Sequence, residues 1–235
     1  VNEYTLSTPY LVTSATYSTL FSVAGQDGAP QSIVFKSDGT KMYMVGSTGD
    51  KVYEYTLSTA WLVSSATYST FISVAGQEIT PYGVTFSSDG AKMYVTGGTG
   101  DDVNEYTLST PWLVSSATYT TVSTLSGKIA TAPVGLLMDP NDLSIYVVES
   151  SNNDVAKFRF GTAHDLSTIY TVKSFSVAGQ DIAPTGVGLS SDGTKMYMLG
   201  NTGDDLNEYT LSTPYDITSA TYTTVSTLSG KIATA

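Results

Sequence analysis

Apolar and polar residues alternate with a two-residue period in short stretches along the whole chain, and turn-forming residues separate the stretches. In Val103–Leu108 the odd-numbered and even-numbered residues form two different sets, which indicates a strand with two unlike faces. In the preceding strand segment both faces are largely apolar (Met93, Tyr94, Val95), as expected for a strand buried on both sides. Ser88–Gly90 (Ser-Asp-Gly) and Thr99–Asp102 (Thr-Gly-Asp-Asp) are typical of hairpin turns. The pattern predicts short strands joined by tight turns, and no stretch has the period of an amphipathic helix.

The strand-and-turn pattern is an internal repeat with steps of 51 or 52 residues. The phrase VNEYTLSTPW or a variant of it, including the divergent VAKFRFGTAH, starts at Val1, Val52, Val103, Val155 and Leu206. The phrase SSDGTKMYM or a variant of it, including the divergent DPNDLSIYV, starts at Lys36, Ser87, Asp139 and Ser190. Residues Ser116–Ala132 recur unchanged as Ser219–Ala235. Each unit therefore contains four strand segments.

Four-stranded units of about 50 residues that recur along a chain are typical of β-propeller blades. Stacking such sheets around an axis buries both faces of each sheet. We therefore predict an all-β fold, a β-propeller of four complete blades plus a half blade, as one domain over 1–235. The repeat boundaries are 1–51, 52–102, 103–154, 155–205 and 206–235. An open β-solenoid or a row of small sandwiches is the alternative.

The run FKSDGTKMYMVGSTGDKVYEYTLS (Phe35–Ser58) resembles the YVTN-type propeller repeat. That family joins a strand, an xDGxxxYV turn and strand, a short acidic or glycine-containing turn and a third strand. The added TPWLVSSATY segment resembles a variant of this repeat in proteins of marine microbes and their phages. The resemblance covers nearly the whole chain and implies a propeller fold. It implies little about function, because propellers carry many unrelated activities.

The repeat begins out of phase with the blades, at a third strand (Val1–Leu6) rather than at a first one. Three readings follow: a segment of a longer propeller, a five-bladed ring with one thin blade, or rings completed by association of several chains. We prefer the segment of a longer protein. Self-association is the other expected source of a closed ring.

Charge and composition exclude several classes of function. Ten Lys and Arg residues stand against 21 Asp and Glu residues, a net charge of -11, so we expect no nucleic-acid partner. No apolar run approaches the roughly 18 residues of a membrane-spanning helix, so we expect no membrane insertion. There is no cysteine and therefore no disulfide framework.

Two sets of repeated residues are candidate binding positions. An aromatic residue recurs between the third and fourth strands of the unit, and it could stack on a ligand such as a sugar or pack on its own blade. This set is Tyr10, Trp61, Trp112 and Tyr215. The turn carboxylates Asp101, Asp102, Asp204 and Asp205 could hold Ca²⁺, the one cofactor we consider, although each turn supplies few of the six to eight oxygens required. Hairpin-turn chemistry is the alternative for these carboxylates.

The divergent copy that starts at Val155 contains the single histidine of the chain, His164, and the single arginine, Arg159. A histidine beside Asp165 could act as a general base. No nucleophile motif and no second histidine accompany it. We therefore interpret this copy as a divergent repeat with a longer surface loop, not as a catalytic site.

These observations favour a non-enzymatic binding or structural module, adhesive or glycan-binding, on the outside of a cell or on a virus particle. Its expected partner is a surface glycan or protein. The alternative is a metal-dependent lactonase-like hydrolase with a site at the central channel. The starts of the first strands carry no carboxylate, which argues against that alternative, but Glu78 and Asp181 lie close by in sequence.

Overall fold

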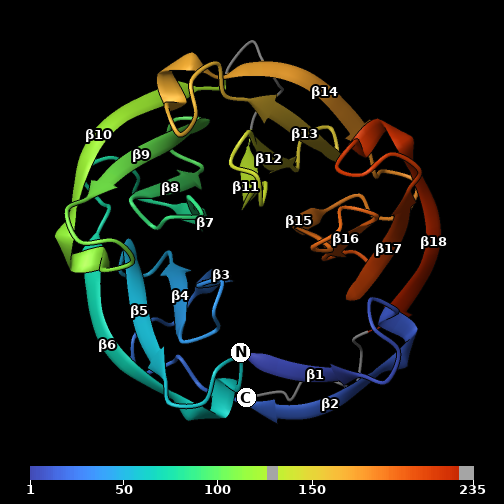
Figure 1. The fold of residues 1–235 in the computed structure, drawn as a ribbon, viewed down its shortest axis with the longest axis horizontal. Coiled ribbons are helices and arrows are strands. Elements are labelled where there is room, and N and C mark those ends of the chain that lie inside the picture. Colours follow the sequence, from blue (N-terminus) through green and yellow to red (C-terminus); the bar gives the residue numbers. More distant parts are fainter. Residues whose placement is uncertain (126–131, 228–235) are drawn as a thin grey trace.

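The computed structural model describes residues 1–125 and 132–227, which form a ring of antiparallel sheets around a central axis (Figure 1). Four sheets have four strands each, and a fifth sheet has two. In each four-stranded sheet the strands follow in chain order, from the first beside the axis to the last on the outside (Figure 1). The predicted all-β propeller with four complete blades is confirmed.

The strands of the half blade are β1 (Asn2–Leu6) and β2 (Ala15–Leu20). Blades 1 and 2 consist of β3 (Pro30–Phe35), β4 (Lys41–Gly46), β5 (Lys51–Leu57), β6 (Ala66–Ser73), β7 (Pro81–Phe86), β8 (Lys92–Gly97), β9 (Asp102–Leu108) and β10 (Ala117–Thr124). Blades 3 and 4 consist of β11 (Pro133–Met138), β12 (Ser144–Glu149), β13 (Asp154–Arg159), β14 (Tyr170–Ser176), β15 (Pro184–Leu189), β16 (Lys195–Gly200), β17 (Asp205–Leu211) and β18 (Ala220–Thr227).

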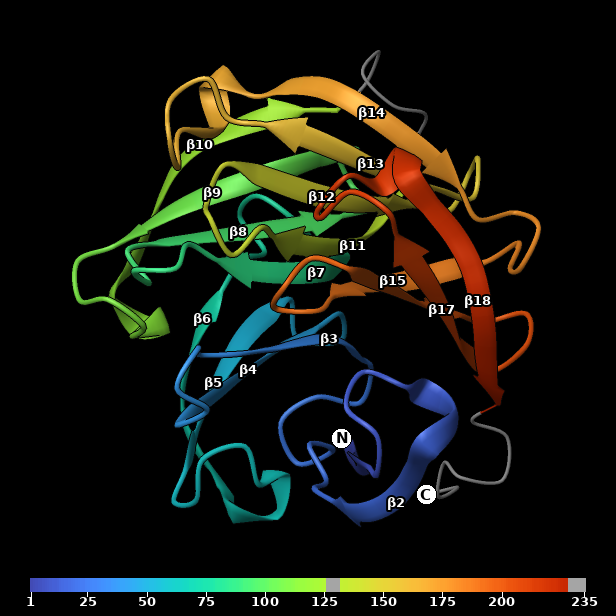
Figure 2. The same cartoon turned by 45° about the vertical axis from the view of Figure 1, so that its right-hand side comes forward.

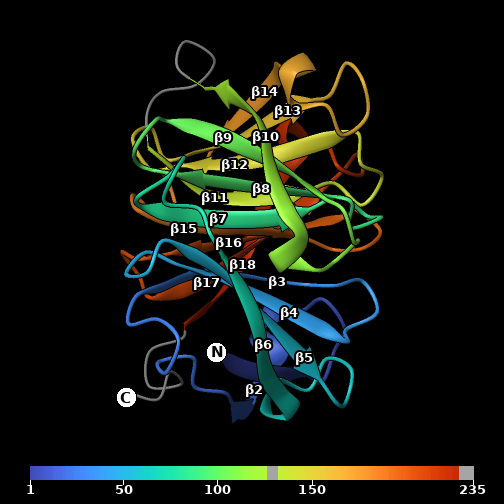
Figure 3. The same cartoon turned by 90° about the vertical axis from the view of Figure 1, so that its left-hand side faces the viewer.

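A short 3-10 helix precedes the outer strand of every blade. These helices are η1 (Val12–Ser14), η2 (Val63–Ser65), η3 (Val114–Ser116), η4 (Leu166–Thr168) and η5 (Ile217–Ser219). The outer strands β6 and β10 form the outside wall of the ring on the side that Figure 3 presents. Within the described residues, no helix is long and apolar enough to span a bilayer.

The core lies between neighbouring blades. Tyr43 and Val45 on β4 pack with Phe86 and Val95 of the next blade in one buried cluster. Similar clusters fill the spaces between blades 2 and 3 and between blades 3 and 4. Both faces of the second strand are buried in blades 1 to 3, as the sequence pattern at Met93, Tyr94 and Val95 predicted, whereas Leu199 on β16 of blade 4 is exposed.

Polar bonds repeat at the seams between blades. At the seam of blades 1 and 2, the buried Glu54 accepts from Lys41 Nζ (2.6 Å) and from the backbone N–H of Val114 in η3 (3.0 Å). Tyr43 donates its hydroxyl to the carbonyl of Trp112 (2.7 Å). Equivalent glutamate bonds occur at Glu3, Glu105 and Glu208. These bonds fix the angle between successive sheets.

The half blade lies between blade 4 and blade 1 and closes the circle (Figures 1 and 2). Val12 donates its N–H to Glu208 of blade 4 (3.1 Å), and Val63 of blade 1 donates to Glu3 (2.9 Å). The half blade therefore shares with the complete blades the bond from a 3-10 helix N–H to a glutamate. The copied segment Ser219–Ala235 lies partly outside the described residues, because these end at 227.

Candidate functional site

A ring-bearing side chain occupies one equivalent position in all five connections between third and fourth strands. The five residues have φ between 60° and 68° and are Tyr10, Trp61, Trp112, His164 and Tyr215. Four of them, Tyr10, Trp61, Trp112 and Tyr215, are the candidate ligand-binding aromatics of the sequence analysis. The fourth in chain order, His164, was expected in a longer loop, and its connection (160–169) is longer than the equivalent ones, such as 109–116 between β9 and β10.

In blades 1, 2 and 4 this ring packs on the glycine of the Ser-Asp-Gly turn in the same blade. The glycines Gly39, Gly90 and Gly193 have φ of 70° to 71°, and a Cβ on any of them would overlap the facing ring. One face of each ring is therefore used for packing. Trp61 is still 53% exposed and Tyr10 43%, so ligand stacking on the remaining surface stays a prediction.

Gly90→Ala is expected to lower the free energy of unfolding by about 2–3 kcal/mol. A left-handed backbone costs a non-glycine residue about 1 kcal/mol, and displacing the Trp112 ring adds an overpacking cost of about 1–2 kcal/mol. Urea unfolding measures the difference. Gly76→Ala is the control, because nothing lies within 4 Å of the added methyl group. Equal stabilities for the two variants would contradict the packing role of the glycine.

Blade 3 replaces both members of this pair. Asp142 stands at the glycine position, with φ of 57°, and His164 stands at the aromatic position. His164 Nε2 lies 3.0 Å from Asp142 Oδ2, so an imidazole–carboxylate pair takes the place of a ring on a glycine. Nε2 is buried, and this contact is an ion-pair distance that does not have the geometry of a hydrogen bond, so Nε2 has no hydrogen-bond partner within the described residues.

Asp142 is held by the neighbouring blade. Ser88 of blade 2 donates its backbone N–H to Asp142 Oδ1 (2.9 Å) and its hydroxyl to Oδ2. Asp142 is buried, at 8% exposure. Tyr94 of blade 2 donates its hydroxyl to the backbone carbonyl of His164 (2.9 Å). The position of the histidine is thus set by contacts from two blades, which is what a preorganised acid–base group requires.

A cavity of about 490 Å³ adjoins His164 at the seam of blades 2 and 3. Its lining residues are Lys92, Glu105, Thr120, Thr121, Ala163, His164, Asp165 and Ser167. Lys92 Nζ donates to Glu105 (2.6 Å) and to Thr107 Oγ1 (2.8 Å). The equivalent Lys41 also donates to the carbonyl of Trp112, whereas Lys92 makes no such bond to His164. Because an ammonium has three N–H donors, one remains for a ligand of Lys92.

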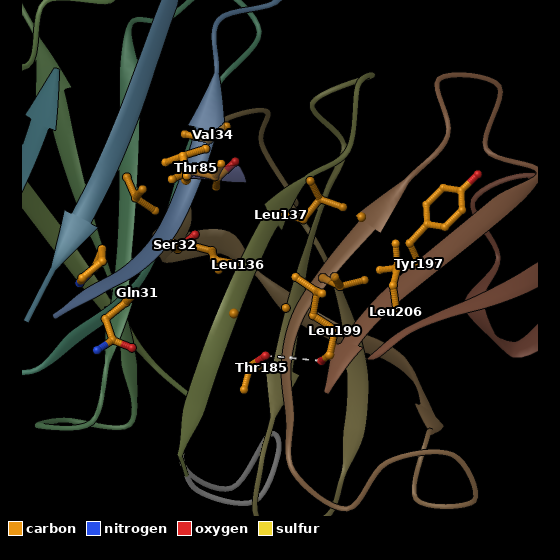
Figure 4. A pocket seen from close by; sticks show the side chains of 18 of the residues that line it. Gln31, Ser32, Val34, Thr85, Leu136, Leu137, Thr185, Tyr197, Leu199 and Leu206 are labelled. Carbon is orange, nitrogen blue, oxygen red and sulfur yellow. Dashed lines mark hydrogen bonds between the residues drawn. The ribbon is translucent and has the colours of Figure 1, made fainter. Parts of the chain in front are cut away.

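The central channel forms a second cavity of about 490 Å³, and its lining is different in chemistry. Figure 4 shows Leu137 of β11 on the side of Leu199 and Leu206, and Leu136 on the side of Ser32 and Thr85. Its polar side chains are Asn2, Gln31, Ser32, Thr85, Thr185 and Tyr197. No carboxylate or imidazole lines the channel, so its residues do not fit the metal assumed in the lactonase alternative.

The two acids that the sequence placed near the channel have structural roles. Glu78 accepts from the backbone N–H groups of Thr80 (2.8 Å) and Thr99 (3.2 Å). Asp181 accepts from Ala183 (2.6 Å) and Thr202 (3.1 Å). Both are buried, and both tie the entry of the first strand to the next hairpin. Within the described residues, no three acids, histidines or cysteines are close enough to hold a metal ion.

The candidate calcium residues lie in pairs at two equivalent turns. Asp102 accepts from Asn104 Nδ2 (2.7 Å), and Asp205 accepts from Asn207 Nδ2 (2.6 Å). Asp101 and Asp204 have φ of 49°, as in a hairpin turn. The geometry assigns these residues a turn role, and calcium binding stays a prediction.

Asp102→Asn is expected to stabilise the fold at pH 7 by about 0.5 kcal/mol, the scale of a partly exposed charge interaction. Burial, and then the charge of Glu78, raise the pKa of the Asp102 carboxyl. A raised folded-state pKa means that the carboxylate destabilises the fold at neutral pH and that the penalty disappears as the pH falls through this pKa. Thermal unfolding at pH 7 and pH 3 measures the difference.

The control is Asp216→Asn, which has the opposite sign. A hydrogen bond from Lys173 lowers the pKa of the Asp216 carboxyl, so this variant is expected to lose stability at pH 7. A loss of stability in Asp102→Asn at pH 7 would contradict the statement that burial and the charge of Glu78 make the Asp102 carboxylate unfavourable in the folded chain.

Solved structures share this fold at low sequence identity. The periplasmic gluconolactonase PpgL of Pseudomonas aeruginosa is 17% identical, with a TM-score of 0.52, over 84% of this chain and 53% of that one. A putative 6-phosphogluconolactonase of Bacteroides uniformis is 15% identical, with a TM-score of 0.52, over 80% and 54%. A chain of the nidogen/laminin complex is 12% identical, with a TM-score of 0.53, over 91% and 68%. This chain spans about half the length of the first two proteins.

No protein-family model matches the chain, and no curated protein sequence matches it either. The structural likeness therefore establishes the fold, a β-propeller with four complete blades, and it does not establish the particular repeat family.

The neighbours contradict the prediction of a non-enzymatic binding or structural module. That prediction rested on near-identical blades without a catalytic constellation. A gluconolactonase and a putative 6-phosphogluconolactonase share the fold over most of this chain. The near-identity of the blades does not extend to blade 3, where Asp142 and His164 form an imidazole–carboxylate pair. The adhesive and phage-related descriptions gain no support.

Proposed function

We propose that the chain is a lactonase-like hydrolase whose site is the His164 cavity at the seam of blades 2 and 3. The observation that carries the proposal is the His164–Asp142 pair, which replaces a ring-on-glycine contact in one blade only. The lactonase neighbours support the class of reaction. No carboxylate or imidazole side chain lines the central channel, which supports the seam over the channel.

The residues of the seam have distinct parts in such a reaction. A water at His164 Nδ1 would attack the carbonyl carbon of the lactone while the imidazole accepts a proton from that water. Asp142, at 3.0 Å from Nε2, would stabilise the imidazolium that forms. The remaining N–H of Lys92 would stabilise the negative charge on the carbonyl oxygen. The ring C–O bond then breaks, and the proton passes from the imidazolium to the leaving alkoxide, so that the product is a hydroxy acid.

The lining of the cavity favours a neutral sugar lactone over a phosphorylated one. Thr120, Thr121 and Ser167 offer hydroxyl groups to the hydroxyls of a sugar. Glu105 and Asp165 place negative charge at the same cavity, and the chain as a whole has a net charge of -11. Like-charge repulsion would disfavour a phosphate group there.

The test is proton release from a panel of five- and six-membered aldonolactones, with and without a phosphate group, measured in a pH-stat with EDTA present. The expected result is hydrolysis of a neutral lactone well above the spontaneous rate and unaffected by EDTA. No acceleration with any lactone would contradict the proposal. Activity abolished by EDTA would contradict the metal-independent chemistry of the seam.

We also propose that the blades are YVTN-type repeats. The support is that the Ser-Asp-Gly glycines have positive φ and that the following Lys-Met-Tyr strand is buried, so the residues shared with that repeat have clear structural reasons. Homologous chains, once aligned, are expected to retain glycine at 39, 90 and 193. Frequent bulky residues there, beside a retained aromatic partner, would contradict the assignment.

A further inference from the structure

Blade 3 differs from the other complete blades in the place of one lysine. Blades 1, 2 and 4 pair a lysine of the second strand with a glutamate of the third, with Nζ–Oε1 distances of 2.6 to 2.8 Å. In blade 3 the lysine position holds Ser144, and the glutamate position holds Lys157. A cation therefore stands where the other three blades have an acid, and the carboxylate that would neutralise it is missing from this blade.

Lys157 keeps a backbone contact of the seam lysines but not their ion pair. Its Nζ donates to the carbonyl of Tyr215 (2.8 Å), as Lys41 Nζ donates to the carbonyl of Trp112 (2.9 Å). The ammonium also lies 5.2 Å from the centre of the Tyr146 ring. Among the described residues, no carboxylate lies within ion-pair distance of Lys157. A carbonyl dipole and a ring face therefore take the place of an acid beside this half-buried amine.

Two further cations lie beside this amine. Lys173 on β14 stands directly opposite Lys157, and Arg159 stands two residues further along β13, on the same face. Lys173 has a counter-charge, because Asp216 lies 2.8 Å from its Nζ. Arg159 is exposed and forms no ion pair with a described residue. Three of the ten basic residues of this acidic chain thus gather on one face of blade 3.

This environment favours the neutral amine form of Lys157. Burial lowers the pKa of its ammonium, and the charges of Arg159 and Lys173 lower the pKa further, against the opposing charges of Asp139 and Asp216. A lysine that is desolvated or placed beside another cation is a nucleophile near neutral pH, and its usual covalent partner is a carbonyl compound. The seam lysines of the other complete blades each face a carboxylate, which favours the charged form.

We propose that Lys157 forms a Schiff base with a 2-oxo acid at the seam of blades 3 and 4. The Nζ lone pair attacks the keto carbon and gives a carbinolamine. The carbinolamine loses one water, which takes up the keto oxygen and the two amine protons, and the imine remains with no change of oxidation state. The hydrogen bond to the carbonyl of Tyr215 uses one N–H of the neutral amine and leaves its lone pair for the attack.

The neighbouring cations select the class of carbonyl compound. Lys173 has one N–H left after its bonds to Asp216 and Thr218, and Arg159 presents an exposed guanidinium. Both are donors for a carboxylate, and a 2-oxo acid carries its carboxylate on the carbon next to the keto group. This site is separate from the cavity at the seam of blades 2 and 3, and it does not depend on the proposed hydrolase.

The test is reductive trapping of the whole chain at pH 7 with pyruvate and cyanoborohydride, followed by peptide mapping with mass spectrometry. Lys157 is expected to gain a carboxyethyl group at least about 10-fold faster than Lys195, because each unit of pKa changes the neutral fraction of an amine tenfold. Lys195 is the matched control, since it is 25% exposed and paired with Glu208. The mapping also separates both lysines from the terminal amine. Equal rates at the two lysines would overturn the proposal.

Methyl pyruvate tests the part assigned to the neighbouring cations. It has the same keto group without the carboxylate charge, so the ratio of label on Lys157 to label on Lys195 is expected to be lower than with pyruvate. Lys173→Gln, checked for folding by circular dichroism, is expected to lower the same ratio with pyruvate, because it removes a cation that binds the carboxylate and favours the neutral amine. Equal ratios for the ester and the acid would overturn the assignment of a 2-oxo acid, and an unchanged ratio in Lys173→Gln would overturn the role of Lys173.

Discussion

His164→Gln is expected to hydrolyse a neutral lactone about 100- to 10,000-fold more slowly than the wild-type chain, measured as kcat/KM. Glutamine fills a similar volume and keeps polar atoms near Asp142, but it cannot accept a proton from water at neutral pH. The loss is expected mainly in kcat, because proton transfer occurs in the transition state and not in substrate binding. This prediction rests on the proposed function.

The matched control is Tyr215→Gln, at the equivalent position of blade 4. It removes a ring that packs on Gly193, far from any imidazole, and it is expected to leave kcat/KM unchanged while lowering stability. Circular dichroism and thermal unfolding establish that both variants are folded. A His164→Gln chain with wild-type activity would contradict the assignment of the histidine as general base.

Glu54→Ala is expected to lower the free energy of unfolding by about 3 kcal/mol, measured by urea denaturation. Glu54 is 1% exposed and serves two donors, Lys41 Nζ at 2.6 Å and the N–H of Val114 at 3.0 Å. Its removal leaves a backbone N–H without an acceptor and a lysine without its counter-charge. Removing one partner of a buried pair costs about 3–5 kcal/mol, and the partial exposure of Lys41 puts this case at the lower end.

Glu3→Ala provides a comparison within the same ring. Glu3 accepts from Val63 in the same manner, but it is half-buried and has no ion pair with a described lysine. Its replacement is expected to cost about 1 kcal/mol, the value of a single hydrogen bond. Equal losses in the free energy of unfolding for Glu54→Ala and Glu3→Ala would show that the Lys41 ion pair and the burial of Glu54 add no stability. That result would contradict the stabilising role of the lysine–glutamate pair at the seam.

The fold was predictable because the chain repeats its own pattern. A strand that is largely apolar on both faces, such as the one that contains Met93, Tyr94 and Val95, needs a neighbour on each side, and stacked sheets supply one for the repeated copies. The thin blade followed from the phase of the repeat at Val1–Leu6. The seam bonds were not predictable, because Glu54 and Val114 lie 60 residues apart and nothing local distinguishes this glutamate from a solvated one.

The candidate site was found only in part. His164 was noticed as the single histidine, but the divergent copy hid its equivalence to Trp112, and Asp142 was not seen to stand where Gly90 stands. Aligning VAKFRFGTAH with VNEYTLSTPW places His164 at the position of Trp112, and aligning DPNDLSIYV with SSDGAKMYV places Asp142 at the position of Gly90. The contact between His164 and Asp142, 22 residues apart, then follows from the contact of Trp112 with Gly90. The structural role of Glu78 and Asp181 was not predictable, because their carboxylates accept hydrogen bonds from backbone N–H groups that the sequence pattern does not reveal.

The most direct test of the central claim is an NMR titration of the single histidine. With one imidazole in the chain, the Cε1–H resonance belongs to His164 without assignment. A lactam analogue of the sugar lactone, which the site would bind without hydrolysis, is added at constant pH. We expect a saturable shift of this resonance, and we expect the analogue to bind more weakly to His164→Gln when binding is measured by calorimetry. Binding of the analogue with the His164 resonance unmoved would place the ligand elsewhere in the ring and contradict the claim that the altered seam is the site.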